Sequence, residues 1–588
     1  MIVPMKKAYI IVQKKDSKEA VASLRSLGLI HIEHQTPPEG TDVVSIKDDI
    51  ATLDRVDTIL TSPGLCGRSG LRDLSLITDW RFAAKHIIDT YARIDHLVEY
   101  SHTLTTEIAA WVPWGDFDPA SITALHKRGV QVRLFRIPAK DSARLPKDLH
   151  VRRVAVQRGL AYCAAVSRGS SELPASEIMP PRLGLNEMRM RLTENDDIIR
   201  ALKDTIRKFT CYHDRFLHIR QAFARELEFH EAMHGMGRDG GLAYLAGYIP
   251  VDVETVLRDA AKRNQWGLVV TEPSEDDAVP TLVRNPRWVE LIAPVFRMLE
   301  IVPGYHELDI SFWFLAFFSV FFGMLIGDAG TGLIFLILTV IGQVKFGKRV
   351  KEKGIFFLFY LLSGCAIVWG LLSGTFFGQE WLPHWFKPLV PALRDDKKVQ
   401  ELCFLLGATQ LSIAHLWRAV IKAPSPRALG DIGWVLFLWG GYFLAKMLVL
   451  GEPFPAVGGW LFIAGTVLIL CMTKPSKNVL KGLGAGAGAL LLNGINSFTD
   501  IVSYIRLFAV GLAAVAISDA FNQMALEIGF GNFVSGLIAA LILVIGQVLN
   551  VLLGPLSVVV HGVRLNVLEF CSHLDIKWSG FRYRPLKD

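Results

Sequence analysis

The sequence predicts an α+β cytoplasmic N-terminal half joined to an all-α polytopic membrane domain. Of its 588 residues, 51% are hydrophobic and only 20% are charged, which is too apolar for a soluble protein with an ordinary surface. Polar residues are mixed in from residue 1 to about 300, whereas long apolar segments follow one another from about 311 to 572. Strand patterns and long heptad patterns occur in the first part. We therefore expect a cytoplasmic arm at 1–300, six membrane helices at 301–475 and two more at 476–588.

Two segments of the N-terminal half show the order strand, helix, strand. Residues 6–34 begin with a β-branched run, continue with an amphipathic segment that stops at Gly28, and end with a second short apolar run. Residues 241–272 repeat this order. These patterns predict two small α/β lobes.

Two long helical patterns lie between these segments. The clearer one, about 186–234, alternates apolar positions at spacings of three and four, and a single helix of that length would be ~70 Å long. A matching pattern lies at about 82–112, with Ile87, Tyr91 and Ile94 on one seam. Because helices of this length need an extended partner, we expect an antiparallel coiled-coil arm with a lobe at each end. Two helices of a compact domain are the alternative.

The apolar half predicts about eight transmembrane helices. The segments lie at about 311–327, 329–344, 355–377, 402–420, 431–450, 456–473, 483–525 and 532–572. The last two are each about 40 residues, or ~60 Å as straight helices, against a hydrocarbon core of ~30 Å. We expect these two helices to be long and tilted.

The basic residues between the spans predict the orientation of the chain. Lysine and arginine follow the second, fourth and sixth spans and fill the tail, whereas the opposite connections hold few of them. The positive-inside rule then places both termini in the cytoplasm, as the lack of a signal-peptide pattern at the start also indicates. The net charge of +7 fits contact with anionic membrane lipids better than binding of nucleic acid.

Several kinds of site are not indicated by the sequence. The seven cysteines are scattered singly, so neither a zinc site nor a disulfide framework is expected. The segment GQVKFGKR at 342–349 matches GxxxxGK but lacks the following Ser or Thr and comes after an apolar span, so we expect no nucleotide site. No catalytic constellation, metal site or cofactor site is expected in this chain.

Each of the two longest spans carries an arginine near its middle. Arg506 lies in SYIRLFAVGLAAVAIS and Arg564 in VVVHGVRLNVLEF. An arginine at the bilayer centre costs at least roughly 2.5 kcal/mol, which points to a functional role. Three roles are open: pairing with an internal acid such as Asp500, Asp519 or Glu569 to fix packing; binding an anionic substrate in a secondary transporter; or facing a mobile carboxylate on a partner subunit.

Several motifs resemble one known family. TDIVSYIRLFAVGLA (499–513), VHGVRLNVLEF (560–570), FFGMLIGDAGTGLI (321–334), WGLLSGTFFG (369–378) and WGDF (114–117) are similar to the membrane stator subunit of V/A-type rotary ATPases, called subunit a or subunit I. The eukaryotic members carry a histidine where Ala514 stands and a glutamate where Gly554 stands, so the resemblance is to the prokaryotic form. It implies a bacterial or archaeal plasma membrane.

The resemblance implies a function and a set of partners. A ring of small membrane rotor subunits with buried carboxylates would turn against Arg506 and Arg564, which separate two half-channels for protons or sodium ions. Peripheral-stalk subunits would bind the N-terminal lobes, central-stalk subunits would contact the arm transiently, and ATP would be made or hydrolysed on other subunits. Polar residues that could line the half-channels are Asp328, Gln410, His415, Asp500, Ser503, Gln547, Asn550, His561 and Glu569.

Overall fold

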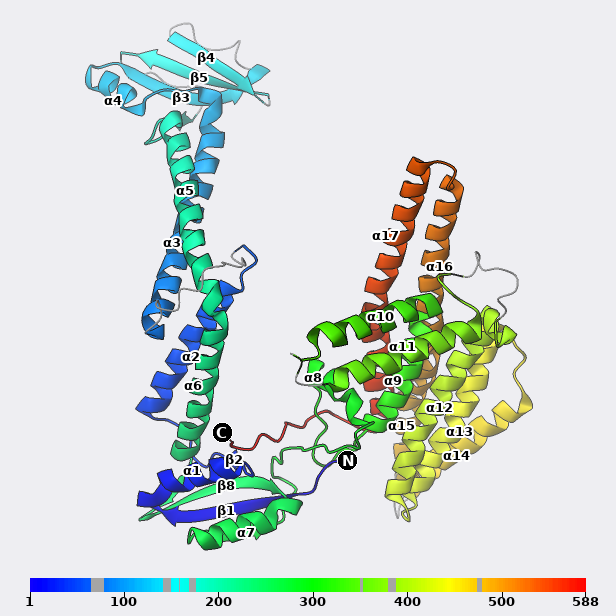
Figure 1. Cartoon of the computed structure of the whole chain (residues 1–588). Helices are drawn as coiled ribbons and strands as arrows, with labels where there is room; N and C mark the ends of the chain where they lie inside the picture. Colours follow the sequence, from blue (N-terminus) through cyan, green and yellow to red (C-terminus); the bar gives the residue numbers. More distant parts are fainter. Residues whose placement is uncertain are drawn as a thin grey trace. The chain divides into compact units, whose positions relative to one another are not determined.

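The computed structural model describes residues 1–64, 79–140, 150–157, 159–168, 176–348, 350, 353–378, 388–472 and 479–587. The chain forms two compact units (Figure 1). The first contains Met1–Ile10, Leu29–His31 and Gly247–Pro585, and the second contains Ile11–Gly28, Ile32–Ala246 and Leu586–Asp588. Each is described by itself below.

The first sheet contains both of the predicted strand–helix–strand segments. Its strands β1 (Met5–Gln13), β2 (His31–Glu33), β8 (Leu242–Pro250) and β9 (Gly267–Thr271) lie in the order β2-β8-β1-β9, and β7 (Gly237–Asp239) pairs with β8. Helices α1 (Ser17–Leu27) and α7 (Glu254–Arg263) connect them. The assignment of the two segments to separate lobes is therefore wrong. Two strands alone are marginal in water, and interleaving them yields one sheet with a buried face.

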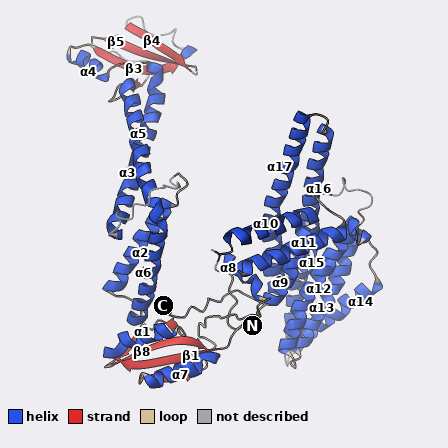
Figure 2. Cartoon of the chain, viewed as in Figure 1, coloured by secondary structure: helices blue, strands red, loops and turns tan. Residues whose placement is uncertain are grey.

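The second sheet comes from residues that the sequence patterns did not single out. Strands β3 (Gln131–Pro138), β4 (His150–Gln157), β5 (Leu160–Ser167) and β6 (Glu177–Ile178) lie in the order β4-β5-β3-β6 (Figure 2). The pairs β3–β5, β4–β5 and β3–β6 are all antiparallel, and Phe135 lies opposite Cys163. Helix α4 (Pro119–Lys127) precedes the sheet and is capped by the Asp118 side chain. The N-terminal half thus has a second sheet, formed by residues other than those predicted to form the two lobes.

The helical arm consists of two successive helix pairs. Helix α3 (Trp80–Trp111) packs with α5 (Leu185–Phe209), and α2 (Thr41–Leu60) packs with α6 (His213–His234) (Figure 1). One buried cluster, which includes Leu53, Ile87, Ile199 and Phe216, runs through both pairs. The single helix expected at 186–234 is wrong, because a 3₁₀ turn at Thr210–Tyr212 divides it where the partner changes.

The C-terminal half is a bundle of apolar helices. Its elements are α9 (Ser311–Ile326), α10 (Ala329–Phe346), α11 (Gly354–Ser373), α12 (Asp396–Lys422), α13 (Arg427–Ala445), α14 (Ala456–Met472), α15 (Val479–Ser503), α16 (Ile505–Ile528) and α17 (Phe533–Ser557). The short helix α8 (Ala293–Met298) precedes them, and α18 (Cys571–His573) ends the series. Within the described residues, six helical stretches are long and apolar enough to cross a membrane: 329–346, 354–373, 396–422, 427–450, 490–528 and 533–573.

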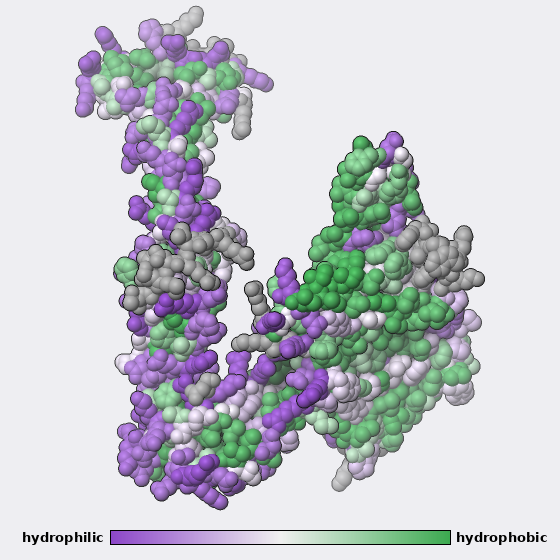
Figure 3. Space-filling view, in the orientation of Figure 1, coloured by the Kyte–Doolittle hydropathy of each residue, from purple (hydrophilic) through white to green (hydrophobic). Residues whose placement is uncertain are grey.

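Two predicted spans correspond to shorter helices. Helices α9 and α14, at 16 and 17 residues, lie at the expected spans 311–327 and 456–473. The outer surface of the bundle is broadly hydrophobic, whereas the arm helices show mainly hydrophilic side chains (Figure 3). This contrast fits a membrane domain and a water-exposed arm.

Helix α9 is largely buried within the membrane unit. It is apolar on all sides, and most of its residues are buried against α11, α16 and α17. A helix with this composition belongs inside a bundle. Gly511 on α16 permits the close approach, because a Cβ there would lie 2.4 Å from the carbonyl oxygen of Met324.

Candidate functional site around two membrane arginines

The two arginines approach one buried carboxylate. Arg564 Nε lies 3.3 Å and Arg506 Nη1 4.0 Å from Glu569 Oε1. The Ser503 hydroxyl lies 3.4 Å from the same oxygen. The Glu569 side chain is 4% exposed, whereas those of Arg506 and Arg564 are 32% and 49% exposed. We call these four residues the arginine site. One carboxylate between two guanidinium groups leaves a surplus positive charge on the surface of the bundle.

Local helix geometry explains how Arg564 reaches Glu569. Helix α17 contains Pro555, and two π-helical segments follow it at Val558–Gly562 and Leu565–Phe570. Proline cannot donate to the preceding turn, and π-turns pair residues five apart. Arg564 and Glu569 are five residues apart, a spacing that a regular α-helix would send to different faces. The π-helical turns therefore help to bring the acid beneath the arginine.

A chain of polar side chains begins next to the arginine site. The Ser503 hydroxyl donates to the carbonyl oxygen of Asp500 at 2.7 Å, and Asp500 Oδ2 lies 3.1 Å from His573 Nε2. His573 Nδ1 lies 2.9 Å from His415 Nε2 on α12. Both imidazoles are largely buried. This arrangement joins α15, α18 and α12 through hydrogen-bonding groups inside the bundle.

The chain of polar side chains continues to the C-terminal end of α12, where Arg418 and Lys422 lie. His415 Nδ1 lies 3.5 Å from Asp431 Oδ1, which also lies 3.4 Å from Arg418 Nε. The Lys422 ammonium lies 2.7 Å from Asp431 Oδ2. Arg418 also reaches the exposed Asp575 at 2.6 Å. We call Asp500, His573, His415, Asp431, Arg418 and Lys422 the charge network.

Gln410 takes part in a separate buried set of hydrogen bonds. The Tyr504 hydroxyl donates to Gln410 Oε1 at 2.8 Å, and Gln410 Nε2 donates to Asn566 Oδ1 at 3.0 Å. Asn566 Nδ2 then donates to the carbonyl oxygen of Gly562 at 3.0 Å. Tyr504 is the residue at which α15 gives way to α16, so these bonds hold α12, α16 and the π-helical region in register.

A cavity lies at the other end of α12. Its lining includes Ser373, Thr375, Arg394 and Asp396, near the start of α12, together with apolar residues of α9 and α16. The residues from α16 are Leu507, Phe508, Gly511, Leu512 and Val515, which follow Arg506 directly along the chain. Along the chain, Arg506 is therefore preceded by Asp500 of the charge network and followed by the residues that line the cavity.

The other predicted residues lie outside the arginine site and the charge network. Asp328 is buried and caps α10 by accepting from the Thr331 backbone N–H at 2.7 Å. Asn550 Nδ2 donates to the Ala514 carbonyl oxygen at 2.9 Å and so ties α17 to α16. Buried atoms of Gln547 and His561 have no hydrogen-bond partner among the described residues.

Several residues of the charge network and of the hydrogen-bonded set around Gln410 were not predicted as site residues. They are His573, Asp431, Arg418 and Lys422 of the charge network, and Tyr504 and Asn566 beside Gln410. A signal existed for Asp431, because an acid that begins an apolar run and becomes buried there needs a partner. His573 and Asn566 give no comparable signal, since their partners come from a distant part of the chain.

These features define a multi-pass membrane protein with a long hydrophilic arm. Aligned over 610 residues, the chain is 31% identical to V-type ATP synthase subunit I of Borreliella burgdorferi, covering 100% of this chain and 99% of that protein. It is 30% identical over 630 residues to V-type ATP synthase subunit I 1 of Treponema pallidum, covering both in full at 100%. With A-type ATP synthase subunit I of Methanocaldococcus jannaschii it shares 22% identity over 442 residues, 68% of this chain and 63% of that protein.

The chain belongs to the subunit I family of V-type and A-type ATP synthases. It is thus a membrane subunit of a rotary ATPase and has other subunits of that complex as partners. A scan against family models finds no match. A solved structure of the cytoplasmic N-terminal domain of a V-ATPase subunit I aligns with 45% of this chain and all of that chain, at 17% identity and a TM-score of 0.21.

Proposed function

We propose that this subunit is the ion-translocating stator of its complex, with two half-channels and a pair of arginines that face carboxylates of a rotating ring. Proton or sodium flow past these arginines would be coupled to ATP synthesis or hydrolysis on other subunits, and this chain would not be catalytic by itself. The observation that carries the proposal is the surplus positive charge of the arginine site, held partly exposed on the bundle surface.

The chemistry of the arginine site suits this role. A guanidinium stays ionised in a low-dielectric setting, and its charge favours the ionised form of a nearby carboxylate. A ring carboxylate that reaches Arg506 or Arg564 would have released its ion and could not pass while carrying it. Glu569 fixes the arginines in place without neutralising both, because it supplies one negative charge for two positive ones.

Two polar routes approach the arginine site from opposite ends of α12. The charge network leads from Asp500 towards Lys422 and the exposed Asp575. The cavity beside Arg394 and Asp396 leads towards Leu507 and Gly511 on α16. We assign these as the two half-channels, offset so that an ion crosses only by riding on the ring.

The proposed mechanism requires eight membrane spans, in which α15 and α16 together form one span. Helices α9 and α14 would span ~24–26 Å, slightly less than the ~30 Å hydrocarbon core. Neighbouring helices cover most of α9 and leave one stripe of it exposed, so little of this short helix has to match the bilayer. Eight spans, with the basic connections inside, place both termini in the cytoplasm of a bacterium or archaeon. The domain limits 1–300, 301–475 and 476–588 follow from the same assignment.

The partners follow from the proposed role. Rotor subunits of the c/K/L type would contact α16 and α17, and peripheral-stalk subunits would bind the two sheets of the N-terminal half. Central-stalk subunits of the d/C type would meet the arm, and membrane lipids would cover the rest of the bundle.

A photo-crosslinking experiment tests the ring-facing surface. A photoreactive amino acid at Val560, which is 51% exposed and four residues from Arg564, should capture a small ring subunit in the assembled complex. The matched control is Val467 on α14, which is 53% exposed and should capture no ring subunit. Capture of the ring from Val467 and not from Val560 would place the rotor on another face and overturn the proposal.

A further inference from the structure

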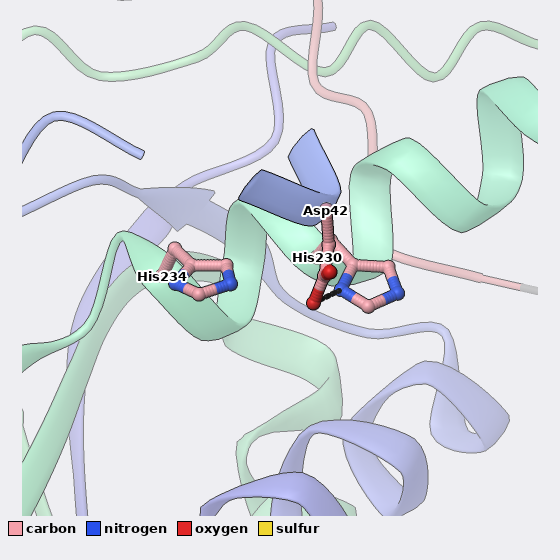
Figure 4. Close-up of side chains that lie close together, drawn as sticks. All are labelled: Asp42, His230 and His234. Carbon is pink, nitrogen blue, oxygen red and sulfur yellow. Dashed lines mark ion pairs between the residues drawn. The ribbon is translucent and has the colours of Figure 1, made fainter. Parts of the chain in front are cut away.

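A cluster of potential metal ligands lies where α2 begins and α6 ends, far in sequence from the arginine site. Asp42 is in the first turn of α2, and His230 and His234 are in the last two turns of α6 (Figure 4). One ligand atom from each of the three side chains lies within 4.8 Å of the others. The cluster is formed within one compact unit.

The two histidines are arranged as a pair. They begin and end the sequence HEAMH, and a spacing of four places them on one face of the helix. Their rings stack with centroids 6.4 Å apart and planes 19° apart. His230 Nδ1 lies 3.9 Å from Asp42 Oδ2, the ion pair drawn in Figure 4.

Two ring nitrogens of this pair have unmet hydrogen-bonding capacity. His230 Nδ1 and His234 Nε2 are buried atoms with no hydrogen-bond partner in the part of the chain that the structure describes. Buried polar atoms nearly always have a partner, and an orphan is destabilising. A bound metal ion would give both nitrogens a partner at once.

The main chain also makes room for the cluster. A Cβ at Gly40 would lie 2.8 Å from His234 Nε2, so the start of α2 lies directly against this imidazole, and a larger residue there would displace the ring. The Thr36 hydroxyl donates to the His234 carbonyl oxygen at 3.2 Å, and the Gln35 N–H donates to the Gly235 carbonyl oxygen at 2.9 Å. These bonds hold the segment before α2 against the end of α6.

We propose that Asp42, His230 and His234 bind a divalent transition-metal ion of the zinc type that joins α2 to α6. Imidazole and carboxylate suit zinc, whereas magnesium and calcium prefer sets of six or more oxygen ligands. With Zn–N and Zn–O distances of ~2.0–2.2 Å, tetrahedral ligand atoms lie ~3.4 Å apart. Side-chain rotations that close the present separations of up to 4.8 Å by at most ~1.4 Å would complete the site, and water would take the fourth position.

With three protein ligands, water would take the fourth position, but the glutamate of the pattern is not free to act as a base, so we infer an anchoring role for the metal. In zinc hydrolases with the H-E-x-x-H pattern, the glutamate acts as general base. Here the Glu231 carboxylate lies 2.7 Å from the Lys47 ammonium on α2, so it forms a second link between the same two helices. The metal would therefore fasten the helix ends next to the first sheet.

Zinc titration of the purified full-length chain tests the proposal. Metal-free protein is titrated with Zn²⁺ against a chromophoric chelator, and we expect one tight site per chain. His230→Gln, His234→Gln and Asp42→Asn should each weaken binding by more than the ~10–100-fold typical of losing an outer-shell group. His218→Gln on α6 and Asp48→Asn on α2, both exposed, are matched controls that should bind as the wild type does.

A second measurement locates the ion and guards against misfolding. In amide hydrogen exchange, Zn²⁺ should slow exchange in residues 40–47 and 228–236 of the wild type and of Glu231→Gln, but not of His234→Gln. Thermal unfolding of the metal-free variants should match that of the metal-free wild type. Tight binding that survives all three ligand substitutions, or protection confined to other segments, would overturn the proposal. So would a wild-type affinity no higher than that of His234→Gln.

Discussion

Glu569 decides how the two membrane arginines are held. Its buried carboxylate lies within 4.0 Å of both guanidinium groups, while the arginine side chains are a third to a half exposed. A buried acid that has lost its charge would leave two like charges close together without a counterion. Glu569 therefore sets the geometry of the arginine site, and the carboxylate of the rotor ring is the proposed partner of the two arginines during ion transport.

Replacing this carboxylate should loosen the membrane unit. We expect Glu569→Gln to lower the free energy of unfolding by about 1–3 kcal/mol, less than for a fully buried pair because the arginines are partly solvated. Thermal unfolding of the full-length chain in detergent measures this change. Glu527→Gln, at an exposed position on α16, is the control and should change the unfolding temperature little. Equal stability of both variants would show that Glu569 does not hold the arginines.

The sequence predicts some site residues and misses others for a physical reason. Arg506 and Arg564 stand out because a charge in an apolar run is costly wherever it finally packs. Asn566, His573 and the link to His415 depend on which helices become neighbours, and spacing along one segment does not carry that information. The pair His230 and His234 is visible in the sequence as HEAMH, but the prediction of no zinc site considered only the spacing of the cysteines.

Individual elements differ from the predictions where helices change partners. The 3₁₀ turn at Thr210–Tyr212 divides a heptad pattern that continues across it, so the pattern shows no break. Helix α2 was not predicted, although Ile46, Leu53 and Leu60 recur at intervals of seven and all are buried. The strand pattern of β3 was equally present in the sequence. Strand–helix–strand order likewise could not show that two such segments interleave in one sheet.

The contact between α9 and α16 offers a test at the level of helix packing. Gly511→Ala should destabilise the membrane unit by about 1–3 kcal/mol, because the new methyl group would meet the Met324 carbonyl oxygen at 2.4 Å. Thermal unfolding in detergent, or recovery of the assembled complex, measures the loss. Gly364→Ala on α11 is the matched control, since nothing lies within 4 Å of a Cβ there. A Gly511→Ala protein as stable as the control would mean that the helices do not need this close approach.

The whole molecule combines a water-exposed arm with a membrane bundle, as the change in composition near residue 300 predicts. The membership in the subunit I family rests on identity along the full chain. We propose that the two half-channels run along the charge network and through the cavity beside Arg394. The outer face of α16 and α17 is where the proposed rotor would have to lie.

The measurement that tests the central claim is the number of ions pumped per ATP hydrolysed, in vesicles that contain the whole complex. Wild type is compared with Arg506→Ala, Arg564→Ala and Arg506→Lys at equal assembly. Arg427→Ala, at an exposed arginine outside the network, is the control. We predict that pumping falls to background in both alanine variants, is strongly reduced in Arg506→Lys, and is unchanged in the control. Pumping that persists at the wild-type ratio in Arg506→Ala would show that this arginine serves packing alone and would contradict the account.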